Sequence, residues 1–108
     1  IFGMPEVKFG AAGGYAALRA AIGDGVARAL ALTARSFDAT EAYRLGMLAE
    51  LVDDGTALAR AEIVAAELAA LPRHGLLLQT DIIRNTVGKS LGDGLAYEHA
   101  VFRRVVLR

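Results

Sequence analysis

Apolar residues recur at intervals of three and four along most of this chain, which is the spacing of helices that bury one face. Glycine and proline stops divide the pattern and predict helices over 15–22, 25–33, 56–71, 75–87 and 91–108. In the last three of these helices the apolar positions predicted to face inward are Leu58, Ala61, Val64, Ala65, Leu68, Leu71, Leu76, Leu78, Ile82, Ile83, Val87, Leu91, Leu95, Phe102, Val105 and Val106.

A further short helix is predicted over 39–45 by its end signals. Asp38 can cap the first turn, and Glu41 follows three residues later, as in a capping box. Phe37 precedes the cap and could pack onto the first turn. Gly46 can adopt the left-handed conformation that ends a helix.

Little of the chain reads as β-structure. The run 1–3 predicts the end of a buried strand, and 47–52 predicts a short strand before a turn at 53–55. The stretch 7–14 predicts a strand remnant or a loop. On the second predicted helix, Asp24 and Arg28 lie four residues apart and are expected to pair weakly.

Composition narrows the class of protein. The 108 residues are 55% hydrophobic and 22% charged, with 12 basic and 12 acidic side chains, which is typical of a globular protein. The zero net charge gives no reason to expect a nucleic-acid or anionic-membrane partner. The absence of cysteine excludes disulfides and thiol catalysis, and charges or glycines interrupt every apolar run before membrane-spanning length. Both ends look cut, so we expect an excerpt from a longer polypeptide.

Glu6 is the first candidate for chemistry. It follows Pro5 at the end of an apolar run, and a carboxylate partly desolvated by Phe2, Met4 and Phe9 could act as a general acid or base. Taken alone, an ordinary exposed glutamate in a turn is the simpler interpretation.

The remaining candidates are weaker. The glycine-rich turn at 10–14 could offer backbone N–H groups to an anion or a water, but a tight packing turn is the simpler alternative. His74 and His99 lack metal-ligand spacing, and Ser90 lacks the setting of a nucleophile.

Three segments in order resemble the enoyl-CoA hydratase/isomerase (crotonase) family. The segment 2–10 (FGMPEVKFG) is similar to the family's F-G-x-P-E-v-x-x-G. The segment 22–33 is similar to its I-G…A-x-x-L-x-L-T, and 35–47 (RSFDATEAYRLGM) to its R-x-F-x-A-x-E-A-x-x-x-G-L. Each match is weak alone, but their order and spacing over 2–55 are specific.

This resemblance implies an α/β fold, a crotonase-like spiral of strand-strand-helix turns. The chain would hold mainly its helical C-terminal part, with the end of the core over 1–55 and a helical region over 56–108. It implies an acyl-CoA thioester substrate, no metal or redox cofactor, a cytoplasmic homotrimer or hexamer, and no nucleic-acid or membrane partner. Glu6 matches a catalytic glutamate of the hydratases, and Pro5, Gly10 and Ala11 match substrate-binding positions.

The sequence also departs from the family pattern. The loop after Glu6 is shorter than the family's P-G-A-G-G-T loop, which puts hydration in question relative to isomerisation. Ala34 replaces a helix-ending glycine, at a cost of about 1 kcal/mol if left-handed. Asp81 replaces a frequent lysine after Thr80, which removes a phosphate contact.

The other catalytic carboxylate and the oxyanion hole would lie upstream of Ile1, so we expect these 108 residues alone to be inactive. Two alternatives stay open. One is a non-catalytic acyl-CoA-binding or assembly member of the same fold, and the other is an independent alanine-rich helical bundle.

Overall fold

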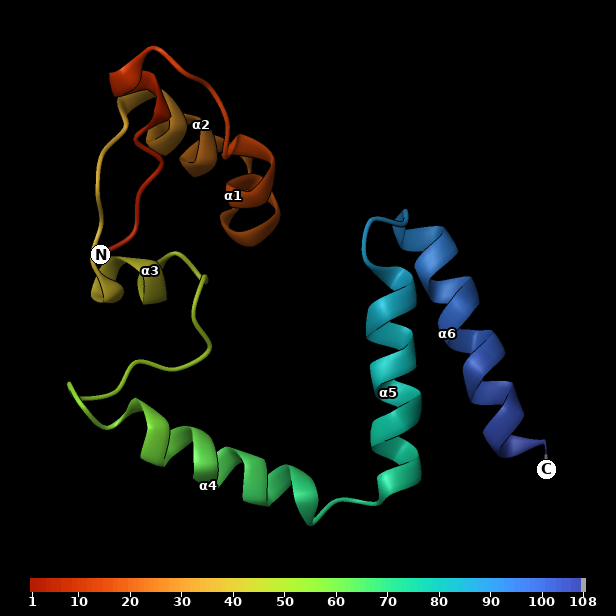
Figure 1. The fold of residues 1–108 in the computed structure, drawn as a ribbon. Coiled ribbons are helices and arrows are strands. Elements are labelled where there is room, and N and C mark those ends of the chain that lie inside the picture. The colour runs from red at the N-terminus through yellow and green to blue at the C-terminus, as the bar shows by residue number, and fades with distance from the viewer. Residues whose placement is uncertain (108) are drawn as a thin grey trace. The chain divides into compact units, whose positions relative to one another are not determined.

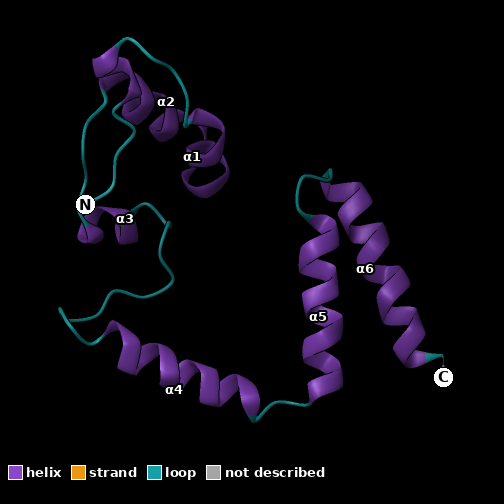
Figure 2. Cartoon of the chain, in the orientation of Figure 1, coloured by secondary structure: helices purple, strands orange, loops and turns teal. Residues whose placement is uncertain are grey.

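The computed structural model describes residues 1–107, which divide into two compact units between Asp54 and Gly55. Helices dominate both units, and no β-strand occurs within 1–107 (Figure 1, Figure 2). This agrees with the predicted helical C-terminal part of a larger fold.

The first unit begins with the 3-10 helix η1 (Glu6–Phe9), followed by α1 (Tyr15–Ile22) and α2 (Asp24–Thr33). The predicted bounds of α1 are confirmed, and α2 begins one residue earlier than predicted. Gly23 separates the two helices with φ 87° and ψ 167°, a conformation that a β-carbon would strain. The break lets α2 fold back and pack against α1.

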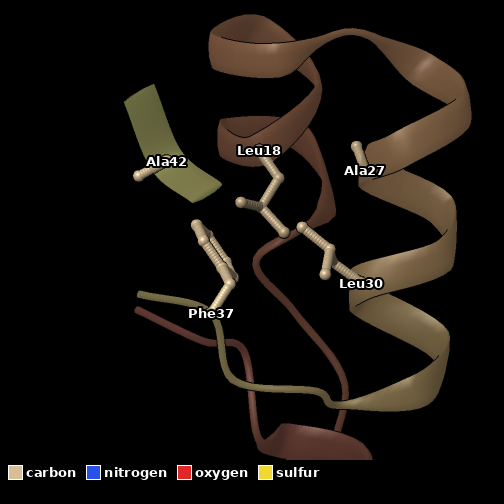
Figure 3. Packing of buried hydrophobic residues seen from close by; sticks show 5 residues of the cluster. All are labelled: Leu18, Ala27, Leu30, Phe37 and Ala42. Carbon is tan, nitrogen blue, oxygen red and sulfur yellow. The ribbon is translucent and has the colours of Figure 1, made fainter. Parts of the chain in front are cut away.

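The core of this unit forms where α1 and α2 meet the chain that follows them (Figure 3). Leu18 and Leu30 are buried between the two helices, and burial of each leucine side chain stabilises the fold by about 1.5–3 kcal/mol. Ala27 is fully buried, because its small side chain allows the helices to approach closely. Phe37 and Ala42 close the cluster.

The short helix predicted from its end signals is confirmed as α3 (Ala39–Arg44). The Glu41 N–H donates to Asp38 Oδ1 over 2.9 Å, so Asp38 is the N-cap. The Glu41 carboxylate accepts from Arg44 Nε at 2.7 Å. Gly46 is left-handed, with φ 81°, as predicted.

A single antiparallel β-bridge ties the start of the chain to the segment before α3. Phe2 N donates to Phe37 O over 2.8 Å, and Phe37 N donates to Phe2 O over 2.9 Å. The two rings stack with their centroids 5.5 Å apart. The predicted strand end at 1–3 is therefore present as one pair of bonds.

Of the two segments for which a strand was considered in the first unit, 7–14 takes mainly the loop alternative, and the strand predicted at 47–52 is wrong. Residues 7–14 form the end of η1 and a loop, because Gly10 turns left-handed and ends the 3-10 helix. Residues 47–52 form irregular chain rather than a strand. A strand needs a neighbouring strand for its backbone bonds, and the described residues supply none to this segment.

The second unit contains α4 (Ala57–Ala69), α5 (Arg73–Thr86) and α6 (Leu91–Val106). Pro72 stands directly before α5, which starts two residues earlier than predicted, since the fixed φ of proline suits a helix start. Between α5 and α6, Gly88 takes φ 80°, and Ser90 Oγ accepts from Asp93 N over 3.1 Å as the N-cap of α6.

Helices α5 and α6 pack as a hairpin (Figure 1). Val101 is 2% exposed, and Tyr97 Oη donates to Asp81 Oδ2 over 2.8 Å. Asn85 Nδ2 also donates to Asp81, and the Lys89 ammonium lies 4.5 Å from the centre of the Tyr97 ring. Asp81 thus joins the two helices.

Part of the predicted inward face is wrong. On α6 the stripe that meets α5 contains Tyr97 and Val101, whereas the more apolar stripe that periodicity favoured lies outside, with Phe102 64% exposed. The predicted inward positions that are in fact exposed are Leu58, Ala61, Ala65, Leu68, Leu71, Ile83, Val87, Leu91, Leu95, Phe102, Val105 and Val106. Leu76, Leu78, Ile82 and Val64 are partly buried, as predicted.

Candidate functional site

The four residues singled out from the sequence lie together in one turn. Pro5 precedes η1, and its carbonyl accepts from Lys8 N over 3.0 Å. Glu6 is the first residue of η1. Gly10 ends it with φ 71°. The Ala11 N–H donates back to the Glu6 carbonyl over 3.0 Å, which closes the turn.

The Glu6 side chain carries a buried polar atom without a partner. The residue is half-buried, and its Oε2 is inaccessible to solvent with no hydrogen-bond partner among the described residues. Leaving a carboxylate oxygen unpaired costs free energy, so such an atom in a folded protein calls for a ligand, a water or a chemical role. Phe9 is 80% exposed, so the predicted shielding of Glu6 by that ring is wrong.

The loop that follows Glu6 runs back to α1. Gly10 N donates to Val7 O over 3.2 Å, and Ala11 N is already paired with Glu6 O. Gly14, at φ 82°, is the N-cap of α1. The N–H groups of Gly10 and Ala11 are therefore engaged inside the turn and not available to a water or an anion.

A polar cluster joins the end of this loop to α2. Tyr15 Oη donates to Asp24 Oδ1, and Arg28 Nε donates to the same oxygen over 2.9 Å, so the predicted pair of Asp24 and Arg28 is confirmed. The Tyr15 and Arg28 bonds lower the pKa of Asp24 below its ordinary value. Asp24 in turn raises the pKa of Arg28.

Two hollows lie near these elements, and Glu6 lines neither of them. One, of about 300 Å³, is lined by Tyr15, Arg28, Ala31 and Leu32. The other, of about 340 Å³, is more polar and is lined by Leu30, Arg35, Ser36, Phe37, Asp38 and Glu41. Arg44 donates to Glu41 at the edge of the second hollow and lowers the pKa of that carboxyl.

Other chemistry finds no support within 1–107. No group of three or more His, Asp or Glu side chains gathers there as metal ligands. Ser90 serves as a helix cap, and His99 is exposed on α6. None of the helices in this part of the chain is long and apolar enough to cross a membrane.

Known proteins are similar to this chain in sequence and in the arrangement of its helices. The chain is 33% identical over 104 residues to the probable enoyl-CoA hydratase EchA8 of Mycobacterium leprae, and the match covers 94% of this chain and 40% of that protein. It is 30% identical over 105 residues to a probable enoyl-CoA hydratase of Rhizobium meliloti, covering 94% of this chain and 41% of that protein.

Solved structures of enoyl-CoA hydratases also match the fold of this chain. The enoyl-CoA hydratase EchA1 of Mycobacterium marinum matches with a TM-score of 0.80 at 30% identity, over 99% of this chain and 44% of that one. The enoyl-CoA hydratase of Mycobacterium tuberculosis matches with a TM-score of 0.79 at 32% identity, over 96% of this chain and 42% of that one. The chain belongs to the enoyl-CoA hydratase/isomerase (crotonase) family. No family model matches it.

The chain spans about 40% of the length of the curated crotonase-family relatives it matches. It corresponds to the C-terminal part of the fold, which accounts for helices without a sheet.

Sequence reasoning missed two contacts around this turn. The Tyr15 hydroxyl donates to Asp24 and so joins α1 to α2, a contact that the sequence does not predict. The sequence predicts Met4 as a neighbour that desolvates Glu6, and the structure also places it against Gly14. The first contact joins the starts of two helices and the second spans a loop, and no periodic signal in the sequence reports such pairs.

Proposed function

We propose that the protein processes acyl-CoA thioesters as a lyase or isomerase of the enoyl-CoA hydratase type, with Glu6 transferring the proton. Family membership supports the substrate class. The observation that carries the role of Glu6 is its buried, unpartnered carboxylate oxygen in a turn that the family motif marks.

The proposed chemistry is proton transfer next to a thioester carbonyl. Removing a proton from that carbon generates an enolate, and returning a proton to it consumes the enolate. The negative charge of the enolate needs hydrogen-bond donors at the thioester oxygen. The resemblance assigns those donors to the part of the domain that precedes this chain. A carboxylate without competing hydrogen bonds, such as Glu6, is suited to take the proton because no bond must first be broken.

Pro5, Gly10 and Ala11 are proposed to line the substrate beside Glu6. The N–H groups of Gly10 and Ala11 are paired with carbonyls of η1, so these two residues would shape the wall of the substrate site without donating hydrogen bonds to the substrate. Pro5 fixes where the turn begins, and Gly10 permits the left-handed end that brings Ala11 back to Glu6.

Replacing Glu6 with Gln in the full-length protein tests the proposal. Glutamine keeps the size of the side chain but cannot accept the proton, so turnover of a short enoyl-CoA should fall by about 10²–10⁴-fold. Steady-state kinetics measure kcat, and thermal melting checks that the variant folds.

The matched control is Glu62→Gln, which removes an exposed carboxylate on α4 and should leave kcat unchanged. Wild-type turnover in the Glu6→Gln variant would remove Glu6 from the mechanism.

A non-catalytic acyl-CoA binder of the same fold is the second candidate. The engaged N–H groups of Gly10 and Ala11 favour it over a hydratase, because these two groups do not donate to a reacting water. Calorimetric binding of acyl-CoA by a folded full-length protein that neither hydrates nor isomerises enoyl-CoA would decide for the binder.

We also propose that the full-length protein assembles as a cytoplasmic homotrimer or hexamer. The exposed apolar side chains of α4 and α6 support burial against other surfaces in the whole protein. Light scattering of the purified full-length protein measures the assembly mass directly.

A further inference from the structure

Met4 makes an unusually close contact with the backbone at the start of α1. A β-carbon placed on Gly14 would lie 2.9 Å from Met4 Cγ, 3.3 Å from Cε and nearer still to Sδ. Real β-carbons do not approach other atoms so closely. The Met4 side chain therefore lies along a surface that only glycine leaves open, and the φ of 82° at Gly14 also requires glycine.

This contact fixes one end of the loop relative to Glu6. Met4 stands two residues before Glu6, and Gly14 stands at the N-cap of α1. At its other end the loop is held by the bond from Ala11 N to Glu6 O. The turn that carries Glu6 and the first turn of α1 are thus held together by Met4.

The α1 side of the contact is itself fixed. Tyr15, the first residue of α1, bonds Asp24, which Arg28 holds on α2. The Met4 side is fixed by the bridge from Phe2 to Phe37. Because both sides are anchored, the volume of the Met4 side chain sets the spacing between the Glu6 turn and α1.

We infer that Met4 is a positioning residue for Glu6, setting through its contact with Gly14 where the Glu6 carboxylate stands. The inference rests on the proposed function of Glu6. Displacing a reacting group by about 1 Å can lower the rate about 100-fold, so a spacer of this kind affects catalysis without touching the substrate.

The test replaces Met4 with Ala in the full-length protein and measures turnover of enoyl-CoA. We expect kcat to fall by roughly 10- to 100-fold with KM little changed, because the displaced group is the proposed proton acceptor. Met47→Ala is the matched control, since Met47 packs on the same core but belongs to the segment after α3 rather than to the Glu6 turn, and it should change kcat less than about 3-fold.

A double variant separates positioning from general loosening of the fold. If Met4 acts through Glu6, adding Met4→Ala to Glu6→Gln lowers kcat no further than Glu6→Gln alone. A full additional loss, or equal losses for Met4→Ala and Met47→Ala, would overturn the inference. If Met4→Ala does not fold, Met4→Val, which is also too short to lie along Gly14, takes its place with the same expected outcomes.

The two proposals fail differently. Wild-type turnover in Glu6→Gln contradicts the proposed function itself. A severe loss in Glu6→Gln with normal kcat in the folded Met4 variant leaves the role of Glu6 intact and refutes only the role of Met4.

Discussion

Ala34 adopts a conformation that alanine normally avoids. It ends α2 with φ 54° and ψ 27°, and it is the one non-glycine residue within 1–107 with positive φ. The sequence predicted this, because Ala34 stands where the family has glycine. A left-handed alanine costs about 1 kcal/mol, and the cost is tolerated because the Ala34 N–H still bonds Leu30 O and the side chain is buried.

Replacing Ala34 with Gly removes this strain but also loses a buried methyl group and adds unfolded-state entropy, so the stability of the full-length protein should change by less than about 1 kcal/mol. Chemical denaturation measures the change in the free energy of unfolding. Ala27→Gly, in the interior of α2, is the control and should destabilise by about 1 kcal/mol or more. A loss of stability in Ala34→Gly equal to that in the control would show that the left-handed conformation carries no strain.

Glu6 shows the limit of residue-level prediction at this site. The motif F-G-x-P-E marked Glu6 and its neighbours Pro5 and Gly10, and the structure gathers them in one turn. The motif does not predict that one oxygen of Glu6 is buried without a partner, or that the N–H groups of Gly10 and Ala11 donate to carbonyls of η1. Both features depend on how the shortened loop closes. The contacts that close a loop join residues with no regular spacing in the sequence, so a sequence pattern does not predict them.

At the scale of elements, Asp24 connects α1 and α2 through Tyr15 and Arg28. Hydrogen bonds from these two side chains lower the pKa of Asp24 below its ordinary 3.8. An acid whose pKa is lower in the folded state adds stability above its unfolded pKa, and this stability disappears as pH falls through the folded pKa. The contribution of Asp24 is thus complete at neutral pH and lost at acidic pH, below 3.8.

We expect Asp24→Asn to lower Tm at pH 7, and the gap from wild type to close as pH falls below 3.8. Thermal melting monitored by circular dichroism at several pH values measures the gap. Asp54→Asn, in the exposed turn before α4, controls for loss of one negative charge. A gap of the same size at pH 3 and pH 7 would mean that the Asp24 charge does not contribute.

Helix existence was predictable across the chain, whereas the buried faces were only partly so. The bounds of α1 and the cap of α3 follow from glycine and Asp38, which act within a few residues. The face of α6 that meets α5 is selected by Val101 and by the bond from Tyr97 to Asp81, a partner on another helix. A single helix pattern contains no information on that partner, so it pointed to the wrong stripe.

For the whole molecule, the exposed apolar surface is the main feature. Leu58 is 73% exposed on α4, and Leu91 and Phe102 are exposed on α6. Surfaces of this kind normally pack against something, and the matched relatives are more than twice as long as this chain. The predicted strand at 47–52 fits the same explanation, since a strand without a neighbour cannot pair.

Expressed alone, residues 1–108 should therefore be poorly folded and prone to associate. Sedimentation velocity at increasing concentration measures the association, and it should decrease in a Leu58→Gln, Phe102→Gln variant, which lowers the exposed apolar area. A monomer that melts cooperatively would contradict this expectation and support the independent helical bundle.

The β-bridge has a consequence for the order of folding. It pairs positions 2 and 37, so the start of the chain lacks this anchor until α1 and α2 have been synthesised and Phe37 can pair with Phe2. Closing so long a loop costs conformational entropy, and burial of the core offsets this cost only after the loop has closed. A nascent polypeptide stalled before Phe37 would hold every atom of the Glu6 turn and still lack the bridge that anchors the residues before it.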